Sequence, residues 1–466
     1  MIVDLVYPAS VSGSENYSSE APLGPIALYS SLDVSQRGNV RFLDSTILSQ
    51  NDIEQNVNHN KADVVALSCT TFNYSNALRV AALAKKNGSY VIAGGIHVTY
   101  MRDAILSKML RGERSIDFLV TNCGEPTLGA LLTALADGSS LTEIPNLSFV
   151  QNGRIVVNPV VNTRSGADPL TVPLVYDNID FKRYSENFQC FGNLSSVRIA
   201  APIFTQRGCA YSGSRKCTFC SIEQMNPRRS SELFEQDVIS LITQHNVDHI
   251  RINDGDFTLD VRHMARIADA AERAAVQTGV RPLYHCFTRA DEIDEERIAI
   301  LKRLNVVSLF IGYESGSDKM LRVMQKHTTR EQNLRATELL KQHGIDVICG
   351  GLVLGAEGES EETLTETLEF VDELQKTGNT KSLLTSPIIP LPGAPAFKRL
   401  MLVLEKDDPA KFLQLASMDD FDLEELVDLW NRHMCKDVSL RRLNDVCKEI
   451  EDKFSIGIRW IKLHQQ

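Results

Sequence analysis

The sequence predicts an α/β protein in which a doubly wound, Rossmann-like sheet precedes a partial (β/α)6 barrel and a small helical C-terminal region. Two observations favour this fold class. Short apolar segments alternate with helical segments over residues 2–136 and again over residues 197–389, an order typical of parallel sheets. Glycines and small polar residues also follow several apolar segments, at the edge where open α/β sheets bind their ligands.

Length and composition divide the chain and restrict its partners. With 466 residues, we expect a sheet domain over 1–140, a linker with a hairpin over 141–196, a barrel over 197–398 and a helical domain over 399–466. The net charge of −11 argues against nucleic acid as a partner. No apolar run suits a membrane span, and the first residues read as a strand instead of a signal peptide. Ten cysteines are too sparse for a disulfide scaffold, so we expect a cytoplasmic protein.

The sheet domain alternates strands and helices along its length. Each predicted strand is a short apolar run, and the runs are separated by segments of helical periodicity. No Gly-x-Gly-x-x-Gly follows the first strand, which argues against a dinucleotide site. The predicted strands are 2–7, 40–43, 64–68, 90–93 and 118–120, and the predicted helices are 24–32, 75–87, 100–109 and 127–136.

The residues that follow these strands suit a large, flat ligand. Glycines permit close approach of a ligand to the backbone, while hydroxyls and helix N-termini donate hydrogen bonds. Ordinary strand-to-helix turns are the alternative interpretation. The candidate ligand-contacting residues are Ser68, Thr70, Thr71, Gly94, Gly95, His97, Gly124 and Glu125.

The barrel follows a hairpin over residues 147–157 that is predicted to turn at Asn152-Gly153. Six strand–helix units fall short of the eight that close a barrel, so we expect an open mouth. Beyond residue 399, helical periodicity continues, and this region is expected to take part in substrate recognition. The predicted strands are 197–204, 249–252, 283–287, 307–312, 346–354 and 383–389; the predicted helices are 232–245, 261–277, 294–304, 330–343, 361–375, 423–430 and 440–454.

Three cysteines, Cys209, Cys217 and Cys220, lie on one loop after the strand at 197–204. Seven residues separate the first two, and two separate the last two. An iron–sulfur cluster with three thiolates and one open iron explains both their number and their place. Zinc is the alternative, although a structural zinc usually takes four ligands and a catalytic zinc a nearby carboxylate base. A third possibility is that these cysteines bind neither.

Further motifs, in order along the chain, resemble those of the radical SAM superfamily. Together they indicate its subgroup with an N-terminal cobalamin-binding domain, and the resemblance covers residues 1–398. The motifs are Cys217-Thr218-Phe219-Cys220, the segments 252–260, 310–317, 351–359 and 390–395, and, in the N-terminal part, 94–97 and 124–127.

Two departures from the family pattern stand out. The first cysteine gap holds seven residues where the family usually has three, and the extra residues include Ser212, Gly213 and Ser214. The Asp-x-His-x-x-Gly sequence that supplies a histidine to cobalt is missing, and Asp44-Ser45-Thr46 stands near its expected place. The resemblance therefore implies cobalamin without a protein imidazole ligand, with absence of cobalamin as the alternative.

The resemblance implies that Cys209, Cys217 and Cys220 hold a [4Fe–4S] cluster whose open iron binds S-adenosylmethionine (SAM). Reductive cleavage of SAM then yields a 5′-deoxyadenosyl radical. The implied SAM-binding residues are Phe219, Asp256 or Asp254, Arg289, Glu314, Gly355 and Glu359. For either aspartate the alternative role is to cap the helix that starts near residue 260. For Arg289 the alternative is a surface ion pair, and for Glu359 it is a helix start.

The resemblance points to methylation of an unactivated carbon centre in a small-molecule or natural-product-like substrate, with methylcobalamin as the methyl carrier. An external donor of the flavodoxin or ferredoxin type would supply the electrons. The first alternative is a cobalamin-binding radical enzyme that performs an oxidative cyclisation or ring rearrangement. The second, from another class, is a non-catalytic zinc or corrinoid carrier. A methylthiotransferase is disfavoured because only Cys69 and Cys123 precede the linker and the C-terminal region reads as helical.

Overall fold

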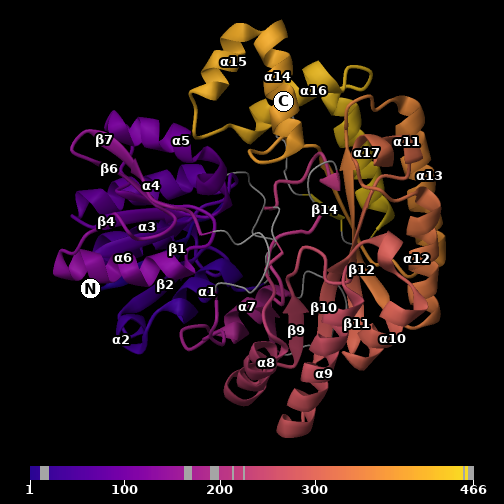
Figure 1. Ribbon diagram of the computed structural model, residues 1–466. Coiled ribbons are helices and arrows are strands. Elements are labelled where there is room, and N and C mark those ends of the chain that lie inside the picture. Colours follow the sequence, from indigo (N-terminus) through magenta and orange to yellow (C-terminus); the bar gives the residue numbers. More distant parts are fainter. Residues whose placement is uncertain are drawn as a thin grey trace. The chain divides into compact units, whose positions relative to one another are not determined.

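The computed structural model describes residues 1–10, 20–161, 170–188, 199–211, 215–223, 226–454 and 457–459 (Figure 1). These residues form two compact units. The first unit comprises residues 1–184, 227–229 and 413–421, and the second comprises 185–226, 230–412 and 422–466. The predicted domain boundaries at residues 140, 196 and 398 stay predictions, because compact units need not coincide with domains.

The first unit is built on a seven-stranded sheet of order β2-β1-β3-β4-β5-β6-β7. Strands β1 to β5 are parallel, and the hairpin of β6 and β7 adds two antiparallel strands at one edge. The order 2-1-3-4-5 is that of a doubly wound sheet, as the sequence predicts. The strands are β1 Val3–Tyr7, β2 Val40–Asp44, β3 Val64–Ser68, β4 Tyr90–Gly94, β5 Phe118–Val120, β6 Leu147–Gln151 and β7 Arg154–Val157.

Helices cover both faces of this sheet because the apolar side chains of each strand alternate between two cores. One core joins the sheet to α3, α4 and α5, and the other joins it to α1 and α6. Helix α5 begins four residues before its predicted start, and α2, α3 and α7 were not predicted. The helices are α1 Leu23–Ser31, α2 Val34–Arg37, α3 Gln50–Asn60, α4 Tyr74–Lys86, α5 Ile96–Leu110, α6 Glu125–Asp137 and α7 Phe181–Phe188.

The second unit is built on a parallel sheet of order β14-β13-β12-β11-β10-β9-β8, which forms a half-barrel. Six of the strands confirm the predicted barrel units. Strand β14 is a seventh that was not predicted, and it pairs with β13. The strands are β8 Ala200–Ile203, β9 His249–Ile252, β10 Leu283–Thr288, β11 Val306–Glu314, β12 Asp346–Leu354, β13 Leu383–Pro387 and β14 Gly457–Arg459.

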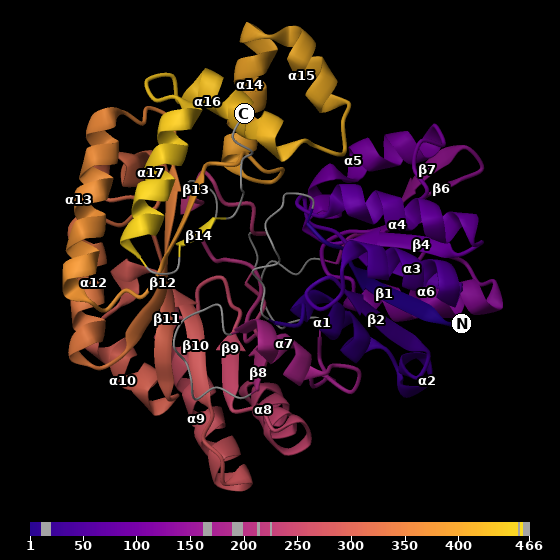
Figure 2. The same ribbon diagram turned by 180° about the vertical axis from the view of Figure 1, so that it is seen from behind.

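Helices cover the outer face of the half-barrel, as both views of the ribbon show (Figures 1 and 2). The C-terminal region is helical, as predicted. Among the residues described, no helix is long and apolar enough to cross a membrane. The helices are α8 Ser231–His245, α9 Val261–Thr278, η3 Ala290–Glu292, α10 Glu295–Arg303, α11 Asp318–Val323, α12 Arg330–Gln342, α13 Glu361–Thr377, α14 Pro395–Asp407, α15 Pro409–Ala416, α16 Leu423–Met434 and α17 Leu440–Lys453.

A glycine directly after β11 lets the turn approach helix α13 closely. A Cβ atom on Gly316 would lie 2.7 Å from the Cα of Thr367 and 2.8 Å from the carbonyl oxygen of Glu366. Both atoms belong to helix backbone and cannot move aside cheaply. The Gly316 N–H also donates to the Thr367 hydroxyl at 3.2 Å.

We therefore expect Gly316→Ala to lower the free energy of unfolding of the second unit by about 1–3 kcal/mol, the usual cost of overpacking a core. Denaturant titration followed by circular dichroism measures this change. Gly24→Ala is the control, because a Cβ at Gly24 meets nothing within 4 Å. A stability of Gly316→Ala equal to that of the control would contradict the close approach.

Candidate functional site

The cysteine loop follows β8 and is fixed by backbone hydrogen bonds to distant segments. The N–H of Cys209 donates to the carbonyl of Glu223 at 3.1 Å, and that of Cys220 donates to Cys217 at 3.2 Å. Thr218 donates to the carbonyl of Met324 at 2.9 Å and accepts from the N–H of Ala396 at 2.8 Å. The loop is thus held between the turn after α11 and the start of α14. Residues 212–214 of the long first gap lie outside the described residues.

The three cysteines lie close enough to one another for their charges to interact, and each keeps part of its surface exposed. Burial raises the pKa of each of them, that of Cys220 to about 11, and Cys209 and Cys217 add to the rise for Cys220. The positive charges of Lys216, Lys326 and Arg289 oppose these rises. Such a setting favours thiolates once iron is bound, because a coordinating thiol is deprotonated outright.

Among the residues described, no three His, Cys, Asp or Glu side chains could together hold a single metal ion. The thiolates of a four-iron cluster bind different irons, so they need not converge on one point as the ligands of a tetrahedral zinc do. Three thiolates are the donor set that a [4Fe–4S] cluster with one open iron takes.

Asp254 and Asp256 follow β9, and the structure separates their roles. Asp254 Oδ1 accepts from the N–H of Thr205 at 2.7 Å and from that of Gln206 at 3.1 Å, and Oδ2 accepts from the Thr205 hydroxyl. Asp254 therefore stabilises the turn that leads from β8 into the cysteine loop. Gly255 lies between the two, and a Cβ there would meet the carbonyl oxygen of Gly208 at 2.8 Å.

Asp256 is 2% exposed, and its Oδ2 has no hydrogen-bond partner. Burial, and then the charge of Glu292, hold the pKa of Asp256 well above its usual value. The Thr258 hydroxyl lies 3.3 Å from Asp256 Oδ1 and 2.7 Å from Glu292 Oε2. A buried carboxylate oxygen without a partner is costly, so it suits a cationic ligand such as an ammonium group. Glu292 was not predicted, because only the fold brings η3 beside the loop after β9.

Arg289 follows β10 and is 6% exposed. Its Nε donates to Asp291 at 3.1 Å, and its guanidinium stacks over the ring of Tyr211 at 4.1 Å. It also donates to the carbonyl of Lys326. Arg289 is thus buried and contacts three different segments, through Tyr211, Asp291 and Lys326. Its ion pair with Asp291 is therefore not a surface ion pair.

Glu314 ends β11 with its backbone in the left-handed region, at φ 65°. Its Oε1 forms an ion pair of 3.0 Å with Lys326, and both side chains are largely buried. Gly312 makes room for the pair, since a Cβ there would lie 2.9 Å from Lys326 Nζ. Lys326 lies twelve residues further along the chain and was not predicted from the sequence as a partner of Glu314.

The remaining predicted SAM-binding residues pack around the same loop. Phe219 contacts a small apolar cluster of Met320, Met324 and Ala356. Glu359 accepts from the N–H of Gly355 at 3.1 Å and from the Thr363 hydroxyl. Glu359 thus links the turn after β12 to the first turn of α13. This contact matches the alternative role predicted for Glu359, that of a residue at the start of a helix. The carbonyl of Gly355 accepts from Trp430 Nε1 at 2.8 Å.

In the first unit, the ends of β3 and β4 approach each other through Gly95. Its φ of 103° suits glycine, and a Cβ there would lie 2.5 Å from the carbonyl oxygen of Cys69. Ser68, Thr70, Gly94 and Gly95 keep partly exposed surface at the ends of otherwise buried strands. These partly exposed strand ends form a backbone edge against which a large, flat ligand could lie.

His97 follows Gly95 and Ile96 and is 1% exposed. Its Nε2 lies 2.7 Å from the carbonyl oxygen of Asp419, and its Nδ1 lies 3.1 Å from the Thr71 hydroxyl. A carbonyl only accepts, so Nε2 carries the proton and Nδ1 accepts from Thr71. Burial lowers the pKa of His97 to about 4, so the ring is neutral. Both nitrogens are engaged, and neither is available to cobalt in this arrangement.

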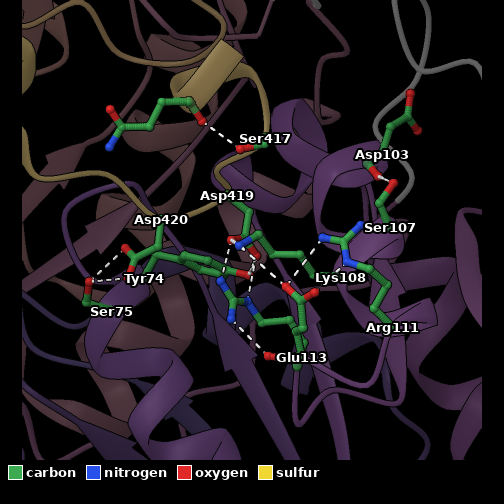
Figure 3. Close-up of polar contacts among 12 residues, drawn as sticks. Tyr74, Ser75, Asp103, Ser107, Lys108, Arg111, Glu113, Ser417, Asp419 and Asp420 are labelled. Atoms are coloured by element: carbon green, nitrogen blue, oxygen red, sulfur yellow. Dashed lines mark hydrogen bonds and ion pairs between the residues drawn. The ribbon is translucent and has the colours of Figure 1, made fainter. Parts of the chain in front are cut away.

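Asp419 belongs to the segment 413–421, which comprises the end of α15 and the turn towards α16 and packs in the first unit. Its buried carboxylate accepts from Arg114 Nε at 2.7 Å and from the Tyr74 hydroxyl at 3.2 Å, and Lys108 Nζ lies 3.6 Å away (Figure 3). The next residue, Asp420, accepts from Ser75 at 2.7 Å. Sequence reasoning missed this anchor, because its partners lie more than 300 residues away.

Gly124 and Glu125 start α6 after β5. A Cβ on Gly124 would lie 2.8 Å from Leu28 Cδ2, the end of a flexible side chain, so Gly124 lies in close contact with α1. Glu125 is buried in the first turn of the helix. Asp44, near the place of the missing cobalt-binding motif, accepts from the Thr46 N–H at 2.9 Å and the Tyr184 hydroxyl at 2.7 Å.

Residues 203–371 match the model of the radical SAM superfamily, and residues 27–132 match that of the B12-binding domain. An uncharacterized methyltransferase of Pyrococcus horikoshii is 26% identical over 384 residues, covering 80% of this chain and 78% of the relative. The anaerobic magnesium-protoporphyrin IX monomethyl ester cyclase of Rubrivivax gelatinosus is 24% identical over 445 residues, covering 92% of this chain and 76% of the relative.

A similar fold is found in the cobalamin-dependent SAM radical enzyme OxsB, solved with aqua-cobalamin and SAM bound. The TM-score is 0.67 at 20% sequence identity, and the match covers 87% of this chain. It covers 61% of the OxsB chain, so this protein spans less than two thirds of that enzyme.

The buried state of His97 makes the stability of the first unit depend on pH. The pKa of His97 is lowered to about 4 in the folded protein, whereas an unfolded histidine titrates near 6.5. The unfolded chain therefore binds the proton more readily, and the contribution of His97 to stability is complete above pH 6.5 and is lost as the pH falls towards 4. The full loss amounts to about 3 kcal/mol.

We expect His97→Gln, whose amide can still donate to Asp419, to reduce the loss of stability between pH 6.5 and 4. The measurement is denaturant unfolding of both proteins at several pH values. His59→Gln is the control, because His59 is exposed on α3. An unchanged pH dependence in His97→Gln would show that the histidine is not buried as described.

Proposed function

Because residues 203–371 match the radical SAM superfamily model and residues 27–132 match the B12-binding domain model, we propose that the chain is a cobalamin-dependent methyltransferase acting on an unactivated carbon centre. The observation that carries the proposal is the presence, in one chain, of this domain and of the three-thiol loop of the half-barrel. The likeness to an uncharacterized methyltransferase over 80% of the chain favours methylation.

Cys209, Cys217 and Cys220 would hold the [4Fe–4S] cluster. When bound, the cluster and SAM supply a 5′-deoxyadenosyl radical, and cobalamin carries the methyl group. Asp256 would receive the ammonium of SAM, and Phe219 would pack beside the adenine. These residues would bind and orient the cofactor.

Around them, Arg289 would direct positive charge towards the carboxylate of SAM. Glu314 would act through its ion pair with Lys326, and Gly355 with Glu359 would shape the turn near the adenine. Asp254 acts one step further out, by holding the turn before the cysteine loop.

The corrin would lie on the edge of the first sheet formed by Ser68, Thr70, Thr71, Gly94 and Gly95. The start of α6, with Gly124 and Glu125, would complete that edge. His97 would support it from within, through its hydrogen bonds to Thr71 and Asp419, without binding cobalt. Exposed glycine backbone and hydroxyl groups suit the amide side chains of a corrin, which need donors and acceptors.

A second candidate function is oxidative cyclisation or ring rearrangement without methyl transfer. The likeness to the Rubrivivax cyclase supports it, since that match covers 92% of this chain. In either case we propose a small-molecule, natural-product-like substrate and an external electron donor of the flavodoxin or ferredoxin type.

The two aspartates after β9 give a matched test of the SAM site. We expect Asp256→Asn to weaken SAM binding by about 10- to 100-fold, because it removes a charge-assisted contact to a cation, while iron content and stability persist. We expect Asp254→Asn to lower the free energy of unfolding and the iron content instead. Equilibrium dialysis of SAM with the reconstituted protein measures the first effect, and iron analysis with denaturant unfolding measures the second. Weaker SAM binding in Asp254→Asn at full stability and iron content would reverse the assignment.

Methyl transfer can be tested before the substrate is known. The protein is reconstituted anaerobically with cluster and cobalamin, reduced, and mixed with methyl-labelled SAM. We expect the label on the corrin, with one S-adenosylhomocysteine formed for each methyl group transferred. Protein without cobalamin is the control. Formation of 5′-deoxyadenosine with no label on the corrin would favour the second candidate function, and absence of the broad visible band of a cluster would refute both.

A further inference from the structure

The second sheet has an outer face, covered by helices, and an inner face. Tyr284 of β10 packs on Phe234 of α8, and Tyr313 of β11 packs on Phe370 of α13, so these tyrosines mark the outer face. Because side chains alternate along a strand, His285, Phe287 and Phe310 belong to the inner face. Arg251 of β9 pairs with His285 in register and lies on the inner face as well.

The inner face carries a cation beside two aromatic rings. The guanidinium of Arg251 lies 4.8 Å from the centre of the Phe287 ring, and Phe287 lies 5.1 Å from Phe310. Register places Arg251 beside His285, yet its guanidinium reaches Phe287, two residues further towards the C-terminal end of β10. The arginine is therefore directed towards the end of the half-barrel where the cysteine loop lies.

These three side chains remain partly exposed, whereas their neighbours on the outer face are fully buried. Arg251, Phe287 and Phe310 each keep accessible surface, while Ile250, Ile252, Cys286, Leu309 and Ile311 are 0% exposed. A glycine, Gly351, stands next to Phe310 on β12, where a Cβ would lie 3.3 Å from the ring. The absence of a side chain on Gly351 thus lets the Phe310 ring lie close to the backbone of β12.

Arg251 brings its positive charge to this surface beside a histidine that carries none. His285 is neutral, because burial and then the charge of Arg251 hold its pKa well below the usual value, and its Nδ1 is bonded to Ser308 at 3.1 Å. Asp346, in register with Ser308, forms its ion pair of 3.1 Å with Lys381.

We propose that Arg251, Phe287 and Phe310 form the substrate-binding wall of the half-barrel, and that the substrate carries an anionic oxygen group beside a flat apolar portion. The guanidinium binds carboxylate or phosphate through paired hydrogen bonds, and the rings stack on the flat portion. The wall lies on β9, β10 and β11, and its rings lie towards the end of the half-barrel that carries the cysteine loop, so a substrate held there has its apolar portion towards the radical source. This inference rests on the proposed function for the identity of the ligand as a substrate.

Binding of simple probes to the reconstituted protein with SAM tests the wall. Benzoate carries an anion and a ring, inorganic phosphate carries only an anion, and benzylamine carries a ring with a positive charge. We expect benzoate to bind more tightly than benzylamine. Arg251→Gln should lower the affinity for benzoate at least tenfold, because it removes a charge-assisted pair. Phe287→Ala should lower the affinity for benzoate but leave the affinity for phosphate unchanged. Calorimetric titration measures each affinity, with Arg266→Gln on the exposed side of α9 as the matched control.

Three results would overturn the proposal. Equal affinity for benzoate and benzylamine would remove the anionic preference, and unchanged benzoate binding in Arg251→Gln would remove the arginine. A parallel fall in SAM affinity in Arg251→Gln would make this residue a contact of SAM instead of the substrate. None of these results depends on methyl transfer, so the labelled-SAM experiment can fail while the wall is confirmed, and the reverse also holds.

Discussion

The buried ion pair between Glu314 and Lys326 fixes the segment on which the geometry around the cysteine loop depends. Lys326 follows Met324 by two residues, and the carbonyl of Met324 accepts from Thr218, between two of the cysteines. The carbonyl of Lys326 accepts from Arg289. One ion pair thus ties β11 to the cysteine loop and to the turn after β10. Buried pairs contribute little net stability, but removing one partner is costly, so this pair confers positional specificity above all.

In the first unit, a buried neutral polar group positions the ends of the strands, where the second unit has an ion pair. The edge of its sheet is supported by the neutral ring of His97, and the ring is held by Thr71 on one side and by the carbonyl of Asp419 on the other. Asp419 is anchored in turn by Arg114 and Tyr74. In both units, residues at the ends of parallel strands receive their partners from other segments of the chain, and those partners decide which groups remain open to a ligand.

The sequence predicted the parallel order and the thiol loop, because these depend on local periodicity and on motifs with fixed spacing. Helix α3 was not predicted, since only Ile53 and Val57 form its buried face. Strand β14 was not predicted, because its place is set by pairing with β13 some 70 residues earlier. Among site residues, the motifs pointed to Glu314 and Asp256, whereas Lys326, Glu292 and Asp419 carry no motif and become visible only through long-range contacts.

The contrast between Asp254 and Asp256 shows where the structure adds most to the sequence. Both are buried carboxylates after the same strand, and the sequence offers them equally. Every oxygen of Asp254 accepts a hydrogen bond from the turn after β8, so a ligand would have to displace protein donors to reach it. Asp256 has an oxygen without a partner and a second carboxylate, Glu292, nearby. A folded protein tolerates such an arrangement at a cost in stability, and a bound cation offsets that cost, because it pairs the open oxygen and relieves the repulsion between the two acids.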